Sequence, residues 1–270
     1  MYFLRQIILD TKVNPKKIPK NPENMVCSET PERSSETEAD GVLWITDQGP
    51  RAQELFRQGC PVLAWLHAHN RDQDFSGVRY ACENLEELDW DYMEKVYCRY
   101  MGIPWDILTT DRCLVRETRA EDLDALYEIY AEPSVTQYTE GLYPQRAQEE
   151  AYLKDYTENM YYFYNYGVWT ICDKITGQVI GRAGFSNREG HEDPELGFVI
   201  GVPWQRQGYA TEVCKALLEY GKEELGFERV QMLVMPENRA SLRLAEKLGF
   251  HRQDRMTWEG ILYERLLLEL

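Results

Sequence analysis

Several features are scarce in this 270-residue sequence, and each scarcity narrows the class of protein. Basic side chains are few: 30 lysines and arginines stand against 46 aspartates and glutamates, so the net charge is −16. Nucleic acids bind to basic surfaces, and the charge balance therefore argues against a nucleic-acid partner. No apolar run approaches the roughly 20 residues that a membrane-spanning helix needs, so we expect no membrane partner either.

Closely spaced metal and disulfide ligands are also missing. The seven cysteines are scattered without a Cys-x-x-Cys pair, which is typical of reduced thiols in a cytoplasmic protein. His67 and His69 are separated by one residue, but no further ligands accompany them, so no metal site is expected. The apolar start of the chain, up to Leu9, is too short for a signal peptide and lacks a small-residue cleavage site. We therefore predict a cytoplasmic protein without a bound metal.

The sequence has no Gly-Lys-Ser/Thr of a Walker loop and no glycine spacing of a dinucleotide site. One stretch nevertheless has the properties of an anion site. Leu196–Gly201 is predicted to be a short buried strand, and apolar residues from Val213 to Tyr220 recur at helical spacing. Between them lies Gln205–Ala210, where unpaired helical N–H groups would meet and Gly208 would allow close approach of a ligand. The pattern predicts a phosphate-bearing ligand other than ATP or NAD.

Gln205-x-x-Gly208-x-Ala210 matches the Gln/Arg-x-x-Gly-x-Gly/Ala signature of the GNAT superfamily of N-acetyltransferases. Two other blocks occur in the family's order. Asp111–Arg116 resembles the first strand of the branch that acetylates ribosomal-protein N-termini, and Pro236–Ser241 followed by Glu246–Phe250 resembles the family's second block. The chain from Arg112 onward therefore resembles a GNAT enzyme, closest to the ribosomal-protein branch.

The resemblance implies an α/β (α+β) GNAT fold for residues 111–270, with a mixed, mostly antiparallel central sheet and a splayed strand. Residues 41–110 alternate strands and helices, which predicts a small Rossmann-like α/β accessory domain with a parallel sheet. This part weakly resembles a haloacid dehalogenase-like domain. Asp47 lacks the second aspartate of that family's Asp-x-Asp pair, so no phosphatase chemistry is expected. The Lys/Pro-rich and Ser/Thr/Glu-rich composition of residues 1–40 predicts a largely disordered extension.

Acetyl-CoA is the co-substrate that the resemblance implies. Main-chain N–H groups at Val199 and Ile200 are candidate donors to the thioester oxygen, the alternative being ordinary ladder bonds within the sheet. Asn238 would bind the pantetheine arm or only cap the helix that starts at Arg239, and Arg206 would bind the pyrophosphate or point into solvent. The complete predicted cofactor-binding set is Val199, Ile200, Gly201, Gln205, Arg206, Gln207, Gly208, Tyr209, Ala210, Thr211 and Asn238.

Acetyl transfer to a lysine-like amine first requires deprotonation, which costs about 4–5 kcal/mol at neutral pH. Glu195 is the candidate base, directly or through water, with Glu192 and Asp193 as neighbours that could raise its pKa; the alternative is a solvated carboxylate at a strand edge. Ser241 is the candidate proton donor to the departing thiolate, or a helix cap. Many family members use a tyrosine as this acid, but Ala245 occupies that position, so the tyrosine mechanism does not carry over.

The predicted function is acetyl transfer from acetyl-CoA to a primary amine, either a protein N-terminus or a small amine, by direct attack in a ternary complex. The acidic surface would attract a cationic acceptor, although such charge can also serve solubility alone. The aromatic run Tyr161–Tyr164 could line an acceptor pocket or belong to the core. The alternative function is a catalytically weak acyl-CoA-binding sensor or scaffold, which Ala245 favours. The sequence leaves the oligomeric state open.

Overall fold

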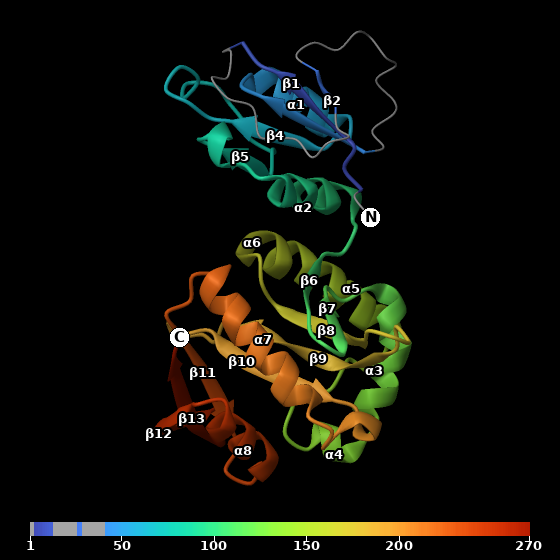
Figure 1. Ribbon diagram of the computed structural model, residues 1–270, viewed down its shortest axis with the longest axis vertical. Coiled ribbons are helices and arrows are strands. Elements are labelled where there is room, and N and C mark those ends of the chain that lie inside the picture. Colours follow the sequence, from blue (N-terminus) through green and yellow to red (C-terminus); the bar gives the residue numbers. More distant parts are fainter. Residues whose placement is uncertain (1–2, 13–25, 29–40) are drawn as a thin grey trace. The chain divides into compact units, whose positions relative to one another are not determined.

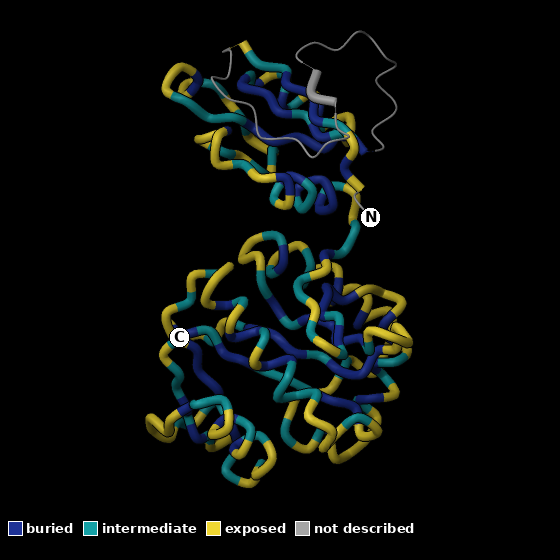
Figure 2. The backbone as a smooth tube through the Cα atoms, viewed as in Figure 1, coloured by how far each residue is buried: buried dark blue, intermediate teal, exposed yellow. Residues whose placement is uncertain are grey.

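A computed structural model of the chain describes residues 3–12, 26–28 and 41–270, and it divides into two compact units, Met1–Trp105 and Asp106–Leu270 (Figure 1). In both units buried residues lie on the central strands and on the inner faces of helices, while exposed residues gather on loops, on outer helix surfaces and on the strand His251–Trp258 (Figure 2). No helix within these described ranges is long and apolar enough to cross a membrane.

The first unit contains a five-stranded sheet in the order β2-β1-β3-β4-β5, and all its neighbouring strands are parallel. The parallel pairing expected from the alternation of strands and helices is therefore present, since a helix between two strands returns the chain to the same end of the sheet. The elements are β1 (Gln6–Asp10), β2 (Val26–Ser28), β3 (Val42–Thr46), α1 (Gly49–Arg57), β4 (Val62–Trp65), β5 (Tyr80–Cys82), the 3₁₀ turn η1 (Leu85–Glu87) and α2 (Trp90–Met101).

The start of the chain differs from the expected disordered extension. Gln6–Asp10 forms β1, which pairs with β3 along its whole length, and Val26–Ser28 forms β2 beside it. Ile7, Ile8 and Leu9 are buried. A short continuous apolar run of this kind suits a parallel strand that is covered on both faces, and this outweighs the polar composition of its neighbours. Residues 13–25 and 29–40 lie outside the described residues, so the expectation for them remains a prediction.

The second unit is built on an eight-stranded sheet in the order β12-β13-β11-β10-β9-β8-β7-β6. Only β10 and β11 are parallel neighbours, and the other pairs are antiparallel, which confirms the mixed, mostly antiparallel sheet. The strands are β6 (Asp106–Thr109), β7 (Cys113–Arg116), β8 (Val168–Asp173), β9 (Val179–Ser186), β10 (Glu195–Ile200), β11 (Arg229–Val234), β12 (His251–Trp258) and β13 (Ile261–Glu269).

The boundary between the units lies earlier than the predicted division after residue 110. Asp106–Thr109 pairs as β6 with β7, and it therefore belongs to the eight-stranded sheet. The reason is local, because helix α2 ends at Gly102, which has a positive φ of 65°. The residues that follow can then pair with β7 as a hairpin. The second unit thus begins at Asp106.

Helices cover both faces of the large sheet. Helices α7 and α8 contribute Val213, Leu217 and Leu242 to the main core, where they pack with residues of the sheet such as Phe185. On the other face, α3 contributes Leu123, Leu126 and Ile129 to a second cluster. The helical segments are η2 (Ala120–Asp122), α3 (Leu123–Tyr130), α4 (Pro133–Thr136), α5 (Arg146–Tyr156), the π turn η3 (Thr157–Tyr161), α6 (Tyr162–Tyr164), the 3₁₀ turn η4 (Val202–Trp204), α7 (Tyr209–Glu223) and α8 (Arg239–Lys247).

The aromatic run near α6 divides between core and surface. Tyr161 is fully buried in the main core, and its hydroxyl donates to the carbonyl of Val168 at 2.6 Å. Phe163 and Tyr164 are 76% and 42% exposed. The run is therefore not a single continuous wall.

Candidate functional site

Strand β10 presents alternate side chains to the two faces of the sheet. Leu196, Phe198 and Ile200 pack in the core beneath α7, whereas Val199 packs in the cluster beneath α3. Because side chains alternate along a strand, Glu195 also faces the α3 side. Strand β10 thus positions both the predicted base and the predicted cofactor loop that follows it.

The two parallel strands β10 and β11 separate soon after they begin. Among the described residues, their only register pair is Glu195 with Gln231, although β10 pairs with β9 over all six of its residues. The carboxyl-terminal part of β10 therefore has a neighbour on one edge only. This is the splayed strand that the resemblance predicts.

Main-chain hydrogen bonding distinguishes the residues of β10 beside this gap. The N–H of Gly201 donates to the carbonyl of Ile180 in the β9 direction at 2.9 Å. Since N–H groups two residues apart in a strand point the same way, the N–H of Val199 also faces β9, and ordinary ladder bonding applies to it. The N–H groups of Phe198 and Ile200 face the gap. Phe198 was not singled out from the sequence, because the direction of an N–H depends on which neighbours the strand acquires.

The loop after β10 is braced by two glutamine side chains. Nε2 of Gln205 donates to the carbonyl of Ile200 at 2.9 Å, and Nε2 of Gln207 donates to the carbonyl of Pro203 at 2.7 Å. Arg206, which is exposed, has a positive φ of 59°, and Gly208 has a φ of 89°. The glutamines therefore fix the shape of a loop that contains two left-handed residues, the second of which favours glycine.

Helix α7 begins directly at this loop. Its first internal bond runs from the N–H of Glu212 to the carbonyl of Gly208 at 3.0 Å, so the N–H groups of Tyr209, Ala210 and Thr211 precede any acceptor within the helix. Together with the positive end of the helix dipole they can bind an anion such as a pyrophosphate.

Arg112, in the turn of the β6–β7 hairpin, links this hairpin to helix α7. Its Nε donates to the Glu212 carboxylate at 2.7 Å and its Nη1 donates to the carbonyl of Gln207 at 3.0 Å. The guanidinium also lies 4.1 Å from the centre of the Tyr209 ring. Burial would raise the pKa of Glu212, but hydrogen bonds from Thr110 and Arg112 outweigh it and lower that pKa. No local motif predicts this role, because Arg112 and Glu212 are 100 residues apart.

Helix α8 carries the other two predicted residues. Asn238 caps this helix, since its Oδ1 accepts the N–H of Ser241 at 3.1 Å. The cap uses only the amide oxygen, and the amide nitrogen is a separate donor that could bind a ligand. Ser241 is half-buried in the first turn, and Ala245, one turn later, is fully buried.

Glu195 is a buried carboxylate with one close cationic partner. Its Oε2 accepts from Nε of Arg188 at 2.9 Å and lies 2.8 Å from Nη2. Burial raises the pKa of Glu195; Arg188 acts against this, and Glu140 adds to it. The predicted repulsion from Glu192 and Asp193 is not among the causes of this shift, and Asp193 itself pairs with Arg229 at 2.9 Å. The side chain is therefore not a solvated carboxylate at a strand edge.

Two aromatic residues of the C-terminal hairpin lie near Glu195. The guanidinium of Arg188 is 5.6 Å from the Trp258 ring. Tyr263 interacts with both Arg188 and Glu195; burial raises the pKa of its phenol. These residues were missed from the sequence because they reach the site through the pairing of β12 and β13 rather than through a local motif.

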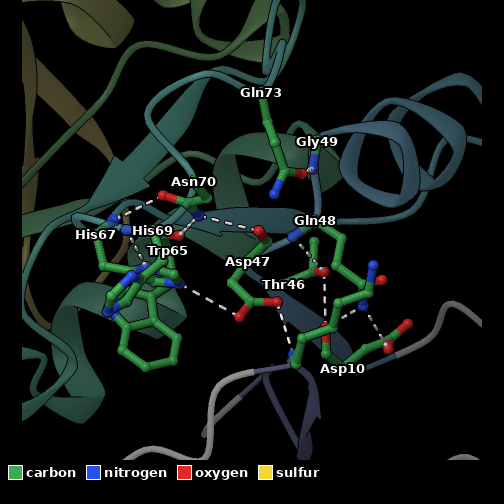
Figure 3. Close-up of polar contacts among 11 residues, drawn as sticks. Asp10, Thr46, Asp47, Gln48, Gly49, Trp65, His67, His69, Asn70 and Gln73 are labelled. Carbon is green, nitrogen blue, oxygen red and sulfur yellow. Dashed lines mark hydrogen bonds and ion pairs between the residues drawn. The ribbon is translucent and has the colours of Figure 1, made fainter.

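The first unit has its own polar cluster at the carboxyl ends of its strands (Figure 3). Asp47 accepts the N–H of Lys12 at 2.8 Å, and its other oxygen is 3.3 Å from Nε2 of His67. Nδ2 of Asn70 donates to the carbonyls of Asp47 and Trp65 at 2.9 and 2.8 Å. These bonds hold together the loops that follow β3 and β4.

A pocket of about 730 Å³ adjoins this cluster, and its lining mixes basic, acidic, amide and aromatic side chains, including Arg71, Glu83, Gln73 and Phe75. Within residues 3–12, 26–28 and 41–270, no group of three or more His, Cys, Asp or Glu residues is arranged to hold a metal ion. The lining favours no single ligand charge.

Comparison with known sequences supports the assignment of the second unit. The family model described as an acetyltransferase (GNAT) domain matches residues 112–251, slightly more than half of the chain. The uncharacterized N-acetyltransferase YoaA of Bacillus subtilis is 32% identical over 149 residues, which cover 54% of this chain and 84% of YoaA. The [ribosomal protein uS5]-alanine N-acetyltransferase of Escherichia coli is 28% identical over 160 residues, covering 56% of this chain and 81% of that enzyme.

Solved structures have the same fold. An acetyltransferase from Agrobacterium tumefaciens aligns with a TM-score of 0.52 at 23% identity, over 60% of this chain and 94% of its own. Spermidine N-acetyltransferase from Vibrio cholerae, solved in complex with CoA and spermine, aligns with a TM-score of 0.50 at 16% identity, over 58% of this chain and 95% of its own.

Proposed function

The chain belongs to the GNAT family of acetyltransferases, and we propose that it transfers acetyl from acetyl-CoA to a primary amine by direct attack in a ternary complex. The observation that carries this proposal is the gap between β10 and β11, which leads to the start of α7. An open strand edge followed by a helix N-terminus offers main-chain donors both to a thioester and to a pyrophosphate.

In this proposal the main chain binds most of acetyl-CoA. The N–H groups of Tyr209, Ala210 and Thr211 hold the pyrophosphate, and Gly208, a residue type that its positive φ favours, places no side chain beside it. The pantetheine arm lies along the gap, where Phe198 and Ile200 offer N–H groups and the side chain of Asn238 offers its amide nitrogen. Binding through the main chain tolerates changes of side chain, which agrees with the modest identity to the relatives.

The chemistry needs three contributions from the protein. The acceptor nitrogen attacks the thioester carbon, and the carbonyl oxygen gains negative charge that the N–H of Phe198 or Ile200 stabilises. Glu195 takes the amine proton, directly or through water, for which a raised pKa makes it a stronger base. The carbon–sulfur bond breaks, the Ser241 hydroxyl gives a proton to the thiolate, and water returns a proton to the serine oxygen.

The acceptor is proposed only as a class. The relatives' names refer to the alanine N-terminus of a ribosomal protein and to spermidine, and both are primary amines. We therefore propose a protein N-terminus or a small amine for this chain. Ala245, at the position where a tyrosine acid would lie, is the one feature that favours a sensor or scaffold without turnover.

The test measures free thiol release from acetyl-CoA across a panel of amines, together with the acetyl-CoA dissociation constant. We expect turnover with at least one amine, and a loss of about 100-fold or more in kcat for Glu195→Gln, the range for general base catalysis. Ser241→Ala should lower kcat less and leave acetyl-CoA affinity unchanged. Tight acetyl-CoA binding without turnover on any amine would contradict the enzyme proposal and favour the sensor.

A further inference from the structure

Arg182 lies on the same face of the sheet as Glu195, one strand away. It belongs to β9 and is the register partner of Val199, whose side chain packs beneath α3. Directly paired residues of antiparallel strands present their side chains to the same face. Arg182 is therefore on the α3 side, beside the end of β10 that faces the gap.

The guanidinium of Arg182 is surrounded by tyrosines rather than by carboxylates. It interacts with Tyr130 at the end of α3, with Tyr152 and Tyr156 on α5, and with Tyr161. Burial raises the pKa of the Tyr130 phenol, and the neighbouring Arg182 acts in the opposite direction. The Nε of Arg182 is shielded from solvent and has no acceptor among the described residues.

An unpaired cation in such a place is unfavourable for the protein alone. Arg182 is half-buried, and shielding part of its guanidinium from solvent without a counter-ion costs free energy that tyrosine hydroxyls recover only in part. Arg116, elsewhere in the same unit, shows the usual solution: it is buried and pairs with both oxygens of Asp122, at 2.7 and 2.6 Å. Among the described residues, none of the ion pairs involves Arg182. Its missing counter-ion points to an anion brought by a ligand.

Space for a ligand exists on this face. Gly197 lies between Glu195 and Val199, and a Cβ atom built on it would meet nothing within 4 Å. Tyr143 and Tyr152 are both 43% exposed, and they begin a row of rings that leads inward through Tyr156 to Tyr161. The successive ring centres in this row are 5.7, 5.8 and 5.2 Å apart. Arg182 is thus approached from solvent along aromatic side chains.

We propose that Arg182, with the hydroxyl of Tyr130, binds a carboxylate of the acetyl acceptor, so that the acceptor is an amino acid rather than a simple amine. This inference rests on the proposed function. Arg182 is one strand, about 4.8 Å, from the segment of β10 beside the gap, which suits an acceptor whose carboxylate lies a few bonds from its amine. One guanidinium offsets one negative charge, which is the charge of a carboxylate, whereas a phosphate dianion carries two. The planar fork of the guanidinium also matches the two oxygens of a carboxylate.

The first experiment compares L-amino acids with their carboxamides, which keep the amine and the side chain but lose the negative charge. L-Phenylalanine and L-leucine with their amides form two matched pairs. We expect kcat/KM to favour the acids by about 10- to 100-fold, the range for a charge-assisted hydrogen bond. Arg182→Gln should abolish this preference and leave kcat/KM for the amides and the acetyl-CoA dissociation constant unchanged. Arg182→Lys should keep part of the preference, and Tyr130→Phe should reduce it.

Equal rates for acids and amides in the wild type, or an unchanged preference in Arg182→Gln, would overturn the inference while leaving acetyl transfer intact. A failure of all amines as acceptors would instead overturn the proposed function.

A second measurement decides the inference without turnover. N-acetyl-L-phenylalanine, the expected product, should bind the CoA-loaded protein more tightly than its carboxamide by calorimetry, and this difference should vanish in Arg182→Gln. Because the cation is unpaired, the Arg182→Gln protein should melt at or above the wild-type temperature. A lower melting temperature combined with equal binding of the acid and the amide would assign Arg182 a structural role and overturn the inference.

Discussion

At the residue scale, Glu195 is under two opposing influences. Burial disfavours its charged form and raises its pKa, whereas Arg188, within 2.9 Å, stabilises the charge. Burial is the larger effect, so the carboxylate stays protonated at pH values where an exposed glutamate would be ionised. A base with a raised pKa accepts a proton more readily once ionised, and loses its activity as the pH falls through that raised value.

We predict that Arg188→Met shifts the acidic limb of the pH profile of kcat/KM to higher pH. The substitution removes the influence that lowers the pKa of Glu195 and leaves burial and Glu140 unopposed. The limb is therefore expected to lie at higher pH than in the wild type, and activity at alkaline pH should be kept. The measurement is kcat/KM for one amine across a pH series that includes the whole acidic limb of both proteins.

Glu195→Gln is the control for this prediction, since it should lose the acidic limb along with most of the activity. An acidic limb that stays at the same pH in Arg188→Met and is still present in Glu195→Gln would contradict the prediction. That result would show that a group other than Glu195 controls the pH profile.

Residues differ in how far the sequence could reveal them. Gly208 and Gln205 belong to a local motif, and the structure gives both a definite part in the loop. Arg112 and Arg182 were not predictable, because Arg112 bonds to a residue 100 positions away and Arg182 is defined by tyrosines from three helical segments. A local pattern predicts main-chain shape, but not a contact made through tertiary packing.

At the element scale, the strand and the helix that form the proposed cofactor site were predictable, while the gap beside the strand was not predictable from residues alone. The pattern Leu196–Gly201 predicts the strand found at Glu195–Ile200 to within one residue. That β10 keeps one neighbour along its length and leaves the other after a single pair depends on how β11 packs. Only the family resemblance supplied that feature. The gap is also the reason that Phe198 replaces Val199 as a proposed donor.

The start of α7 allows a matched pair of substitutions. Gly208 and Gly226 both have a positive φ, 89° and 68°, and both belong to the second unit. An alanine at either position costs about 1–2 kcal/mol, because an L-residue is strained in the left-handed region. We predict that Gly208→Ala weakens acetyl-CoA binding by about tenfold, equivalent to one charge-assisted hydrogen bond. Gly226→Ala should lower the melting temperature similarly and leave binding unchanged.

Calorimetric titration with acetyl-CoA and thermal unfolding of both proteins check this prediction. Equal acetyl-CoA affinities at equal loss of stability would mean that the pyrophosphate does not lie at Gly208.

At the scale of the whole molecule, the chain consists of two units with separate sheets and separate cores. The predicted candidate site lies wholly in the second unit, on β10, α7 and α8. The boundary between the units decides which residues this site needs. Strand β6 and Thr110 precede the predicted boundary, yet Oγ1 of Thr110 donates to the carboxylate of Glu212 at 2.6 Å, beside the proposed pyrophosphate site.

We therefore predict that a protein of residues 106–270 folds and binds acetyl-CoA with the affinity of the full chain. A protein of residues 111–270 should be less stable and should bind acetyl-CoA more weakly. The longer protein keeps the β6–β7 hairpin and the bond from Thr110. The shorter one exposes an edge of β7 and loses the Thr110 bond to Glu212, which leaves Arg112 as the partner of that carboxylate near the phosphates. Its melting temperature should be lower by several degrees, because a loss of about 1 kcal/mol lowers the melting temperature of a domain of this size by roughly 2–4 °C.

Thr110→Val in the full chain separates the two effects: it should weaken acetyl-CoA binding and leave β6 in place. Equal affinity and equal stability of the two truncated proteins would show that the acetyltransferase unit begins after β6.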